Sequence, residues 1–141
     1  MPHLKSFREL IAWQKAMDLA DLIYELTEPF PQREHFGLAY QLRKSAVSIP
    51  SNIAEGTRRK TLVYLNHLEI SLGSHAELDT QCELGTRRKY IQPGDRLRLQ
   101  SQIDEVGRII HGLERSVERC IRSAATLVAA LAPDQTNPRP N

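Results

Sequence analysis

Residues 34–56, EHFGLAYQLRKSAVSIPSNIAEG, decide the fold of this chain, because a helical pattern runs through a proline in their middle. At about 100° per residue, one arc of about 80° holds five apolar residues of this stretch, namely Leu38, Leu42, Ala46, Ile49 and Ile53. Pro50 removes a backbone donor and disfavours helical geometry at Ile49. Because the apolar phase continues across the proline, the pattern predicts one helix from Glu34 to Gly56 that bends at Pro50. Gly56 is expected to end that helix in the left-handed conformation.

Three further helices are predicted around this segment. The first runs from Ser6, a suitable N-cap, to Thr27, where the prolines of PFP stop it. The third runs from Thr61 to Lys89, and its apolar residues are spread nearly around the axis, which favours a central, widely buried helix. The fourth runs from residue 95 to residue 131, and its opposite face is polar. Its single apolar stripe consists of Leu99, Ile103, Val106, Ile109, Ile110, Leu113, Val117 and Ile121.

Four long helices with short connections predict an all-α fold, an up-down-up-down four-helix bundle with its second helix kinked at Pro50. With 141 residues, 40% of them hydrophobic, the chain has enough material for one domain, which we place at residues 1–131. Residues 132–141, APDQTNPRPN, have no apolar period, and we expect them to form a disordered C-terminal tail. The sequence contains neither a membrane-spanning apolar run nor an apolar signal core, so we expect a cytoplasmic protein.

The first three predicted helices carry more apolar circumference than one bundle of this length hides. We therefore expect copies of the chain to bury it in a homo-oligomer. The alternative is that the broad stripes reflect a thick core within one copy.

Residue patterns typical of catalysis or metal binding are missing from the sequence. It has no GxSxG elbow, no GxxxxGK[ST] loop and no Glu-x-x-His pair of the kind that binds metals in helical bundles. His67 and His75 lie about 80° apart on the third helix, which favours solvated or interface histidines over metal ligands. Cys82 and Cys120 are expected to be buried free thiols. We therefore expect a non-enzymatic protein without metal or cofactor.

Three polar residues stand out within the predicted helix packing. Glu69 has the same helical phase as apolar neighbours, where an ionised carboxylate needs a partner. Asn52 and Glu55 lie beside Pro50 and can either satisfy backbone groups that the proline frees or receive a basic partner from a neighbouring helix. We favour a structural polar network for these residues, with a small-molecule pocket around Glu69 and Asn52 as the alternative.

The basic residues fall into three clusters. The net charge is only +2, yet residues 86–98 hold five cations and one anion. The candidate nucleic-acid-binding residues are Arg58, Arg59 and Lys60 in the loop after the second helix, Arg87, Arg88 and Lys89 at the end of the third, and Arg108, Arg115, Arg119 and Arg122 on one face of the fourth. The planar guanidinium group of arginine can donate two hydrogen bonds to the oxygens of one phosphate. The alternative is an ordinary solvated surface, in which Arg87–Lys89 complement a helix end and pairs such as Asp104 with Arg108 and Glu118 with Arg122 neutralise each other.

The stretch QLRKSAVSIPSNIAEG, with FRELIAWQKAMDLADLIYELTEPFPQREHFGL before it and LNHLEISLGSHAELDTQCELG after it, resembles a family of bacterial four-helix bundles. These are the proteins encoded in 23S ribosomal RNA intervening sequences, and the resemblance covers residues 7–117. The tightest match is Ile49–Gly56, with further matches at Gly73, Ser74 and Glu77. The resemblance adds Ser74 and Glu77 to the expected structural polar residues, and it implies a ring of five subunits.

The resemblance also extends to a related branch, which includes the accessory variability determinant of diversity-generating retroelements. That protein is a basic five-subunit bundle that partners a reverse transcriptase with nucleic acid. Together with the basic clusters, the resemblance favours an oligomer that binds RNA or other nucleic acid without strong sequence specificity. The binding surfaces would be basic rims, in which each cluster is repeated around the oligomer. The alternative is an interaction scaffold that docks a partner protein without nucleic acid. For both functions we expect no membrane partner.

Overall fold

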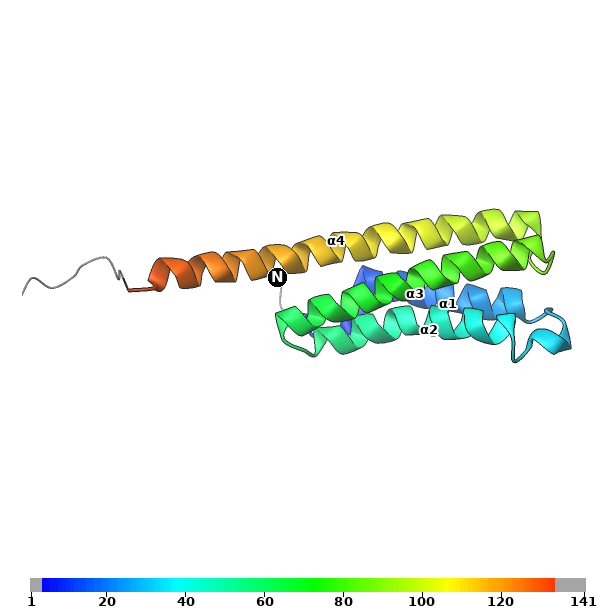
Figure 1. Cartoon of the computed structure of the whole chain (residues 1–141), viewed down its shortest axis with the longest axis horizontal. Coiled ribbons are helices and arrows are strands. Elements are labelled where there is room, and N and C mark those ends of the chain that lie inside the picture. Colours follow the sequence, from blue (N-terminus) through cyan, green and yellow to red (C-terminus); the bar gives the residue numbers. More distant parts are fainter. Residues whose placement is uncertain (1–3, 134–141) are drawn as a thin grey trace, which may run out of the picture.

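The computed structural model describes residues 4–133, which form four long helices and two short 3-10 helices without any strand. In chain order these are η1 (Phe7–Glu9), α1 (Ile11–Thr27), η2 (Gln32–Glu34), α2 (Leu38–Thr57), α3 (Thr61–Arg87) and α4 (Pro93–Leu131). Successive long helices run in alternating directions along the long axis of the molecule (Figure 1). Each packs against two others, α1 and α3 both lying between α2 and α4. The predicted all-α helical bundle is confirmed.

Aliphatic side chains from all four long helices meet in one core. The largest fully buried ones are Leu19, Ile23, Leu42, Ile49, Ile53, Leu68, Leu78, Leu99, Ile103, Val106, Ile110 and Val117. The predicted stripe of α4 supplies five of these residues, and its other members pack at the edge of the core. That stripe is therefore confirmed.

Helix α2 continues without a break through Pro50, which is buried. The prediction of one helix across the proline is confirmed, and the bend remains a prediction. The helix begins at Leu38 rather than Glu34, because the Glu34 carboxylate accepts a hydrogen bond from the Leu38 backbone amide at 2.9 Å. The prediction for Gly56 is wrong, since this glycine lies inside α2 and no glycine of the described chain has a positive φ.

Two other helix ends differ from the prediction. Ser6 caps η1 instead of α1: its hydroxyl accepts from the Arg8 amide at 3.2 Å, and extended backbone at Leu10 separates the two helices. Helix α3 stops at Arg87, and Lys89 adopts a φ of 62° in the turn that follows. Residues 134–141, most of the predicted tail, lie outside the described part of the chain.

The seam between α2 and α3 combines small side chains with polar bridges. Its hydrogen bonds join Ser45 to Gln81 at 2.9 Å, Ser48 to Ser74 at 2.7 Å, the Ile49 carbonyl to Ser71 at 3.0 Å, and Asn52 to His67 at 3.0 Å. At the end of the seam, a Cβ added to Gly56 would lie 2.6 Å from the ring of Tyr64. The two helices therefore approach closely, and the motif around Pro50 supplies the residues that allow it.

Helix α3 buries only one face within a single copy. Tyr64, Leu68, Leu78 and Cys82 lie on that face. On the outer side, four large apolar side chains are exposed, namely Leu62, Val63, Ile70 and Leu84. The expectation that α3 is widely buried is thus wrong for one copy, because its outer side has no helix against it.

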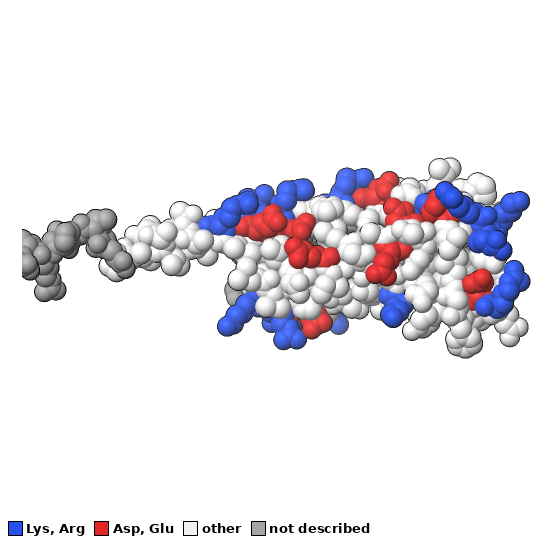
Figure 2. All heavy atoms as spheres, viewed as in Figure 1, with Lys and Arg blue, Asp and Glu red and all other residues white. Residues whose placement is uncertain are grey.

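Helix α4 is much longer than its neighbours and projects beyond the bundle (Figure 1). Val117 is its last buried residue, and every residue from Arg122 to Leu131 is exposed. We call residues 122–131 the α4 extension. Beyond Arg122 the extension carries no charge, and it forms the white rod in Figure 2. Between residues 4 and 133, no helix combines the length and hydropathy that a membrane span requires.

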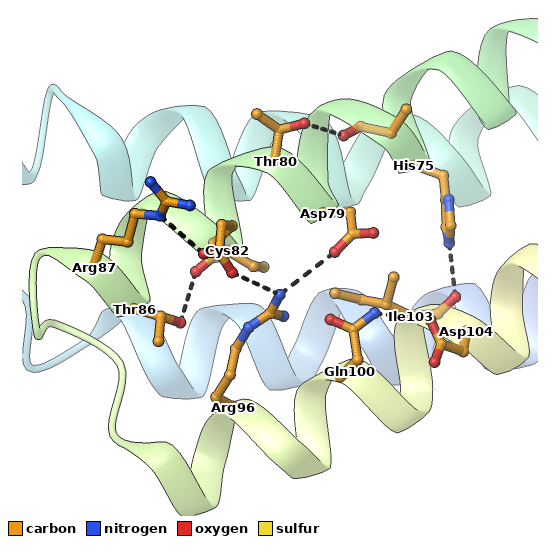
Figure 3. Close-up of polar contacts among 12 residues, drawn as sticks. His75, Asp79, Thr80, Cys82, Thr86, Arg87, Arg96, Gln100, Ile103 and Asp104 are labelled. Carbon is orange, nitrogen blue, oxygen red and sulfur yellow. Dashed lines mark hydrogen bonds and ion pairs between the residues drawn. The ribbon is translucent and has the colours of Figure 1, made fainter.

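Polar contacts connect α3 to α4 (Figure 3). Arg96 of α4 points toward α3, where its Nη2 atom lies 3.6 Å from a carboxylate oxygen of Asp79 and 3.6 Å from one of Glu83. One turn closer to the middle of the bundle, His75 Nε2 lies 2.7 Å from the Ile103 carbonyl. Since the Arg96 side chain is only 17% exposed, this arginine belongs to the helix packing.

We predict that Gly56→Ala lowers the free energy of unfolding by about 1–3 kcal/mol, because the added methyl overlaps the buried Tyr64 ring. Urea unfolding followed by circular dichroism measures the change. Gly73→Ala is the matched control: Gly73 is helical with open space around it, so alanine should stabilise the helix by about 0.5–1 kcal/mol. Equal effects at the two positions would argue against the close seam.

We also predict that Arg96→Gln lowers the free energy of unfolding by about 1–3 kcal/mol, since two carboxylates on α3 lose a largely buried cation. Arg98→Gln is the control on the same helix. Arg98 forms an exposed pair with Glu25, so its loss should change stability by less than about 0.5 kcal/mol. The same urea titration compares both variants, and an effect of Arg98→Gln as large as that of Arg96→Gln would contradict this assignment.

Candidate nucleic-acid interface

All of the basic residues singled out from the sequence are exposed. Figure 2 shows blue surface at both ends of the bundle and along α4. The loop after α2 and the end of α3 lie at opposite ends, separated by the 27 residues of α3, or about 40 Å at 1.5 Å per residue. One copy therefore does not combine these two clusters into one patch.

The first basic surface, which we call the loop end, surrounds the connection between α2 and α3. Arg58 lines a hollow of about 420 Å³ together with Lys5, so the segment before α1 adds a cation there. Arg8 follows in η1, with its guanidinium 4.7 Å from the centre of the Phe7 ring. Because α4 runs antiparallel to α3, Arg119 comes level with the start of α3 and joins the same end. Sequence reasoning missed Lys5 and Arg8, whose position depends on how the chain folds back.

The second basic surface, the turn end, surrounds the connection between α3 and α4. It contains Arg87, Arg88 and Lys89 of the predicted cluster. Arg33 of η2 joins them, since its guanidinium lies 3.4 Å from the Tyr90 hydroxyl. Sequence reasoning also missed Arg33. Its place in this cluster depends on a contact between the α1–α2 connection and this turn, which the sequence does not show.

Two of the candidate arginines are already paired with a glutamate four residues earlier in the chain. Arg59 lies 3.0 Å from Glu55, and Arg87 lies 2.9 Å from Glu83. The hydrogen bond from Arg87 is the main reason why the pKa of Glu83 is lowered. Eight of the ten candidates form no ion pair with another residue of the range 4–133: Arg58, Lys60, Arg88, Lys89, Arg108, Arg115, Arg119 and Arg122.

The i,i+4 pairs suggested for α4 do not form in the described chain. Asp104 instead accepts a hydrogen bond from Gln100 at 2.8 Å, and Arg108 is left without an anionic neighbour within ion-pair distance. Glu118 and Arg122 also remain apart. The positive face of α4 is therefore not neutralised from within its own helix.

Three of the five predicted structural polar residues take part in cross-helix contacts. Ser74 is the partner of Ser48, and Asn52 donates to the Ser48 carbonyl at 2.9 Å while its oxygen faces His67. Glu55 forms an ion pair with Arg59 at 3.0 Å, and His67 Nε2 of α3 lies 3.8 Å from its carboxylate. His67 is thus tied into the seam and not solvated.

Glu69 and Glu77 are corrections to the prediction. Both are exposed on α3, and neither forms a hydrogen bond or an ion pair with a described residue. The buried face of α3 contains Tyr64, Leu68 and Leu78. The helical phase of Glu69 instead matches apolar residues such as Leu62, which is itself exposed. Asn52 and Glu69 consequently do not converge on a pocket.

Burial keeps one thiol and one phenol of the described chain protonated. Burial raises the pKa of Cys82 to about 12, so this thiol stays protonated at neutral pH. Cys120 is half-buried, which corrects the expectation of two buried thiols. Burial also raises the pKa of Tyr64 to about 12. Within residues 4–133, no three His, Cys, Asp or Glu side chains lie close enough together to hold a metal ion.

Comparisons with known proteins agree on the fold. The profile of the family described as 23S rRNA-intervening sequence protein matches residues 8–112. A crystal structure from Bacteroides thetaiotaomicron VPI-5482, a protein with unknown function from the S23 ribosomal protein family, superposes with a TM-score of 0.68 at 20% sequence identity. The match covers 74% of this chain and 96% of that one. No curated protein has significant similarity to the chain. The profile match covers most of the chain, which therefore belongs to the 23S rRNA-intervening sequence protein family.

Proposed function

We propose that this protein binds RNA or another nucleic acid through its basic ends, as a non-enzymatic homo-oligomer in the cytoplasm. The observation that carries the proposal is the set of eight exposed cations without an ion-pair partner among the described residues. They gather at the loop end, at the turn end and on the face of α4 between them. A surface of unpaired cations attracts phosphates and releases their counterions when it binds.

The loop end is the surface best suited to a phosphate backbone. Arg58 and Lys60 are exposed in the loop, Lys5 lines the same hollow as Arg58, and Arg8 is exposed in η1. Two aromatic rings line the same hollow as Arg58. Tyr64 is buried, and the half-buried Phe7 ring already packs against Trp13 and the Arg8 guanidinium, so neither is free for base stacking. Contacts from this surface therefore go to phosphate and sugar groups, which favours recognition of folded RNA or duplex by shape.

Self-assembly is supported by apolar side chains that one copy leaves in water. On α1, Ile11 is 61% exposed, and on α3, Leu62 is 69% exposed. Further exposed residues on the first three long helices are Met17, Tyr24, Tyr40, Val47, Val63, Ile70 and Leu84. Burial of such surface between copies repeats each basic end around an assembly, with the five subunits that the family resemblance implies. Repetition raises the affinity for a long polyanion without any new contact.

Substitution of the loop cluster tests this proposal. The triple variant Arg58→Gln, Arg59→Gln, Lys60→Gln should bind a fluorescent RNA hairpin more weakly at low salt, because phosphate contacts are lost. The slope of log affinity against log salt should fall by up to about one unit per lost contact. Fluorescence anisotropy over a salt series measures both quantities, and the triple variant at Arg87, Arg88 and Lys89 measures the turn end in the same way.

Lys44→Gln is the matched control, since Lys44 is an exposed cation on α2 without an ion pair in the described chain. It should leave affinity and salt slope unchanged. Wild-type protein that fails to bind RNA or DNA, or triple variants that bind like Lys44→Gln, would contradict the proposal. A co-purifying protein in place of nucleic acid would support the scaffold function instead.

A further inference from the structure

Lys89 holds a backbone conformation that normally belongs to glycine. Its φ is 62°, and it is the only residue of the described chain with a positive φ. Two backbone hydrogen bonds close α3 around it, from its own amide to the Thr86 carbonyl at 2.9 Å and from the Tyr90 amide to the Gly85 carbonyl at 2.9 Å. This is the Schellman arrangement, in which glycine usually takes the left-handed position because a Cβ is strained there.

The end of α3 does not need a lysine at this position. A cation in the last turn interacts favourably with the carbonyl end of a helix, and Arg87 and Arg88 supply that charge with helical backbone. The Lys89 side chain is exposed and forms no ion pair with a described residue. Backbone strain without a structural gain points to a use of the side chain itself.

Lys89 lines a hollow of about 550 Å³, the turn-end hollow, which it shares with residues of the α1–α2 connection. That connection and the turn between α3 and α4 lie at the same end of the bundle (Figure 1). The rings of Tyr90, Pro29 and Pro31 line the hollow. The Tyr90 ring is held by the buried Phe30 ring, with 5.2 Å between their centres. The hollow therefore has the size of a small-molecule site and ring-lined walls.

Hydrogen-bonding groups lie beside these rings. Asp95 is half-buried in the hollow, and its carboxylate forms no hydrogen bond or ion pair with a described residue. The second carboxylate of the hollow, that of Glu25, is paired with Arg98 at 3.5 Å. Gln92 donates one long hydrogen bond, to the Lys89 carbonyl at 3.4 Å. The hollow thus offers a free carboxylate and an amide to a ligand.

The charges around the hollow select the kind of ligand. Cations lie at its rim: Lys89 lines it, Arg88 precedes Lys89 in the chain, and Arg33 lies 3.4 Å from the Tyr90 hydroxyl. These cations attract phosphate, but a phosphate inside the hollow would face the Asp95 carboxylate. A nucleotide avoids this conflict, because its phosphate stays at the rim while its base enters. Carboxylates accept hydrogen bonds from base amino groups, and unpaired bases pack against rings.

We propose that the turn-end hollow binds one unpaired nucleotide of a nucleic acid. Its phosphate contacts Lys89, its base packs against Tyr90, and Asp95 accepts a hydrogen bond from a base amino group. This inference rests on the nucleic-acid binding proposed above and names the form of nucleic acid that the turn end recognises. The two ends of the bundle then differ: the loop end contacts the backbone, whereas the turn end requires a base without a pairing partner.

Two RNA ligands with equal numbers of nucleotides test the proposal, a hairpin with an unpaired loop and a blunt duplex. Lys89→Gly should weaken hairpin binding several-fold more than duplex binding, as measured by fluorescence anisotropy. The same variant should raise the urea midpoint of unfolding, since glycine relieves the strain. Lys89→Gln is the matched control, because it removes the charge and keeps a Cβ: it should weaken hairpin binding equally without raising the midpoint. Hairpin binding by Lys89→Gly that equals the wild type would overturn the proposal.

Asp95→Ala separates recognition of a base from attraction of phosphate. Because it removes a negative charge, a surface that only attracts phosphates should bind both RNAs more tightly. The base contact predicts instead that hairpin binding weakens several-fold while duplex binding does not. Glu77→Ala, which removes an exposed carboxylate from α3, is the control for charge and should treat both RNAs alike. Tighter binding of both RNAs by Asp95→Ala would contradict the base contact.

The two RNAs also separate this inference from the function on which it rests. Wild-type protein that binds neither RNA contradicts nucleic-acid binding as a whole. Wild-type protein that binds both, with variants of Lys89 and Asp95 that change hairpin and duplex affinity by the same factor, contradicts only the nucleotide site.

Discussion

The close contact between α2 and α3 is the constraint on which the rest of the structure depends. Small residues and polar bridges at the seam let the two backbones approach, and Gly56 has no room for a Cβ against Tyr64. Helix α2 continues past the buried Pro50 to Thr57 and thereby carries the loop end to its position. The seam also fixes which side of α3 faces outward, and with it the exposure of Leu62 and Ile70.

Much of the fold could be predicted from the sequence, because helical periodicity is local. The continuous helix through Pro50 and the stripe of α4 both follow from apolar phase. The prediction of a buried Glu69 was wrong because apolar residues occur on nearly all sides of α3. Helical periodicity alone therefore does not show which side of α3 faces the core. The hydrogen bonds of the seam could not be predicted, since they join residues far apart in the sequence, such as Ser45 and Gln81, which are 36 residues apart. Likewise, Lys5 and Arg58 line one hollow only in the folded chain.

The arrangement separates two kinds of basic residue that look alike in the sequence. Arg96 is largely buried between Asp79 and Glu83 and holds α3 against α4, whereas Arg58 and Arg88 are exposed and unpaired within residues 4–133. Only the second kind is available to phosphates. The net charge of +2 conceals this surface, because acidic residues such as Glu83 neutralise cations at other positions.

Assembly of several copies is the claim that links the apolar surface to the proposed role, since a single bundle holds its two basic ends about 40 Å apart. The most direct measurement is the mass of the dilute, native protein by light scattering coupled to size-exclusion chromatography. The account predicts a multiple of the 16.1 kDa chain mass. A single particle of 16.1 kDa would contradict it.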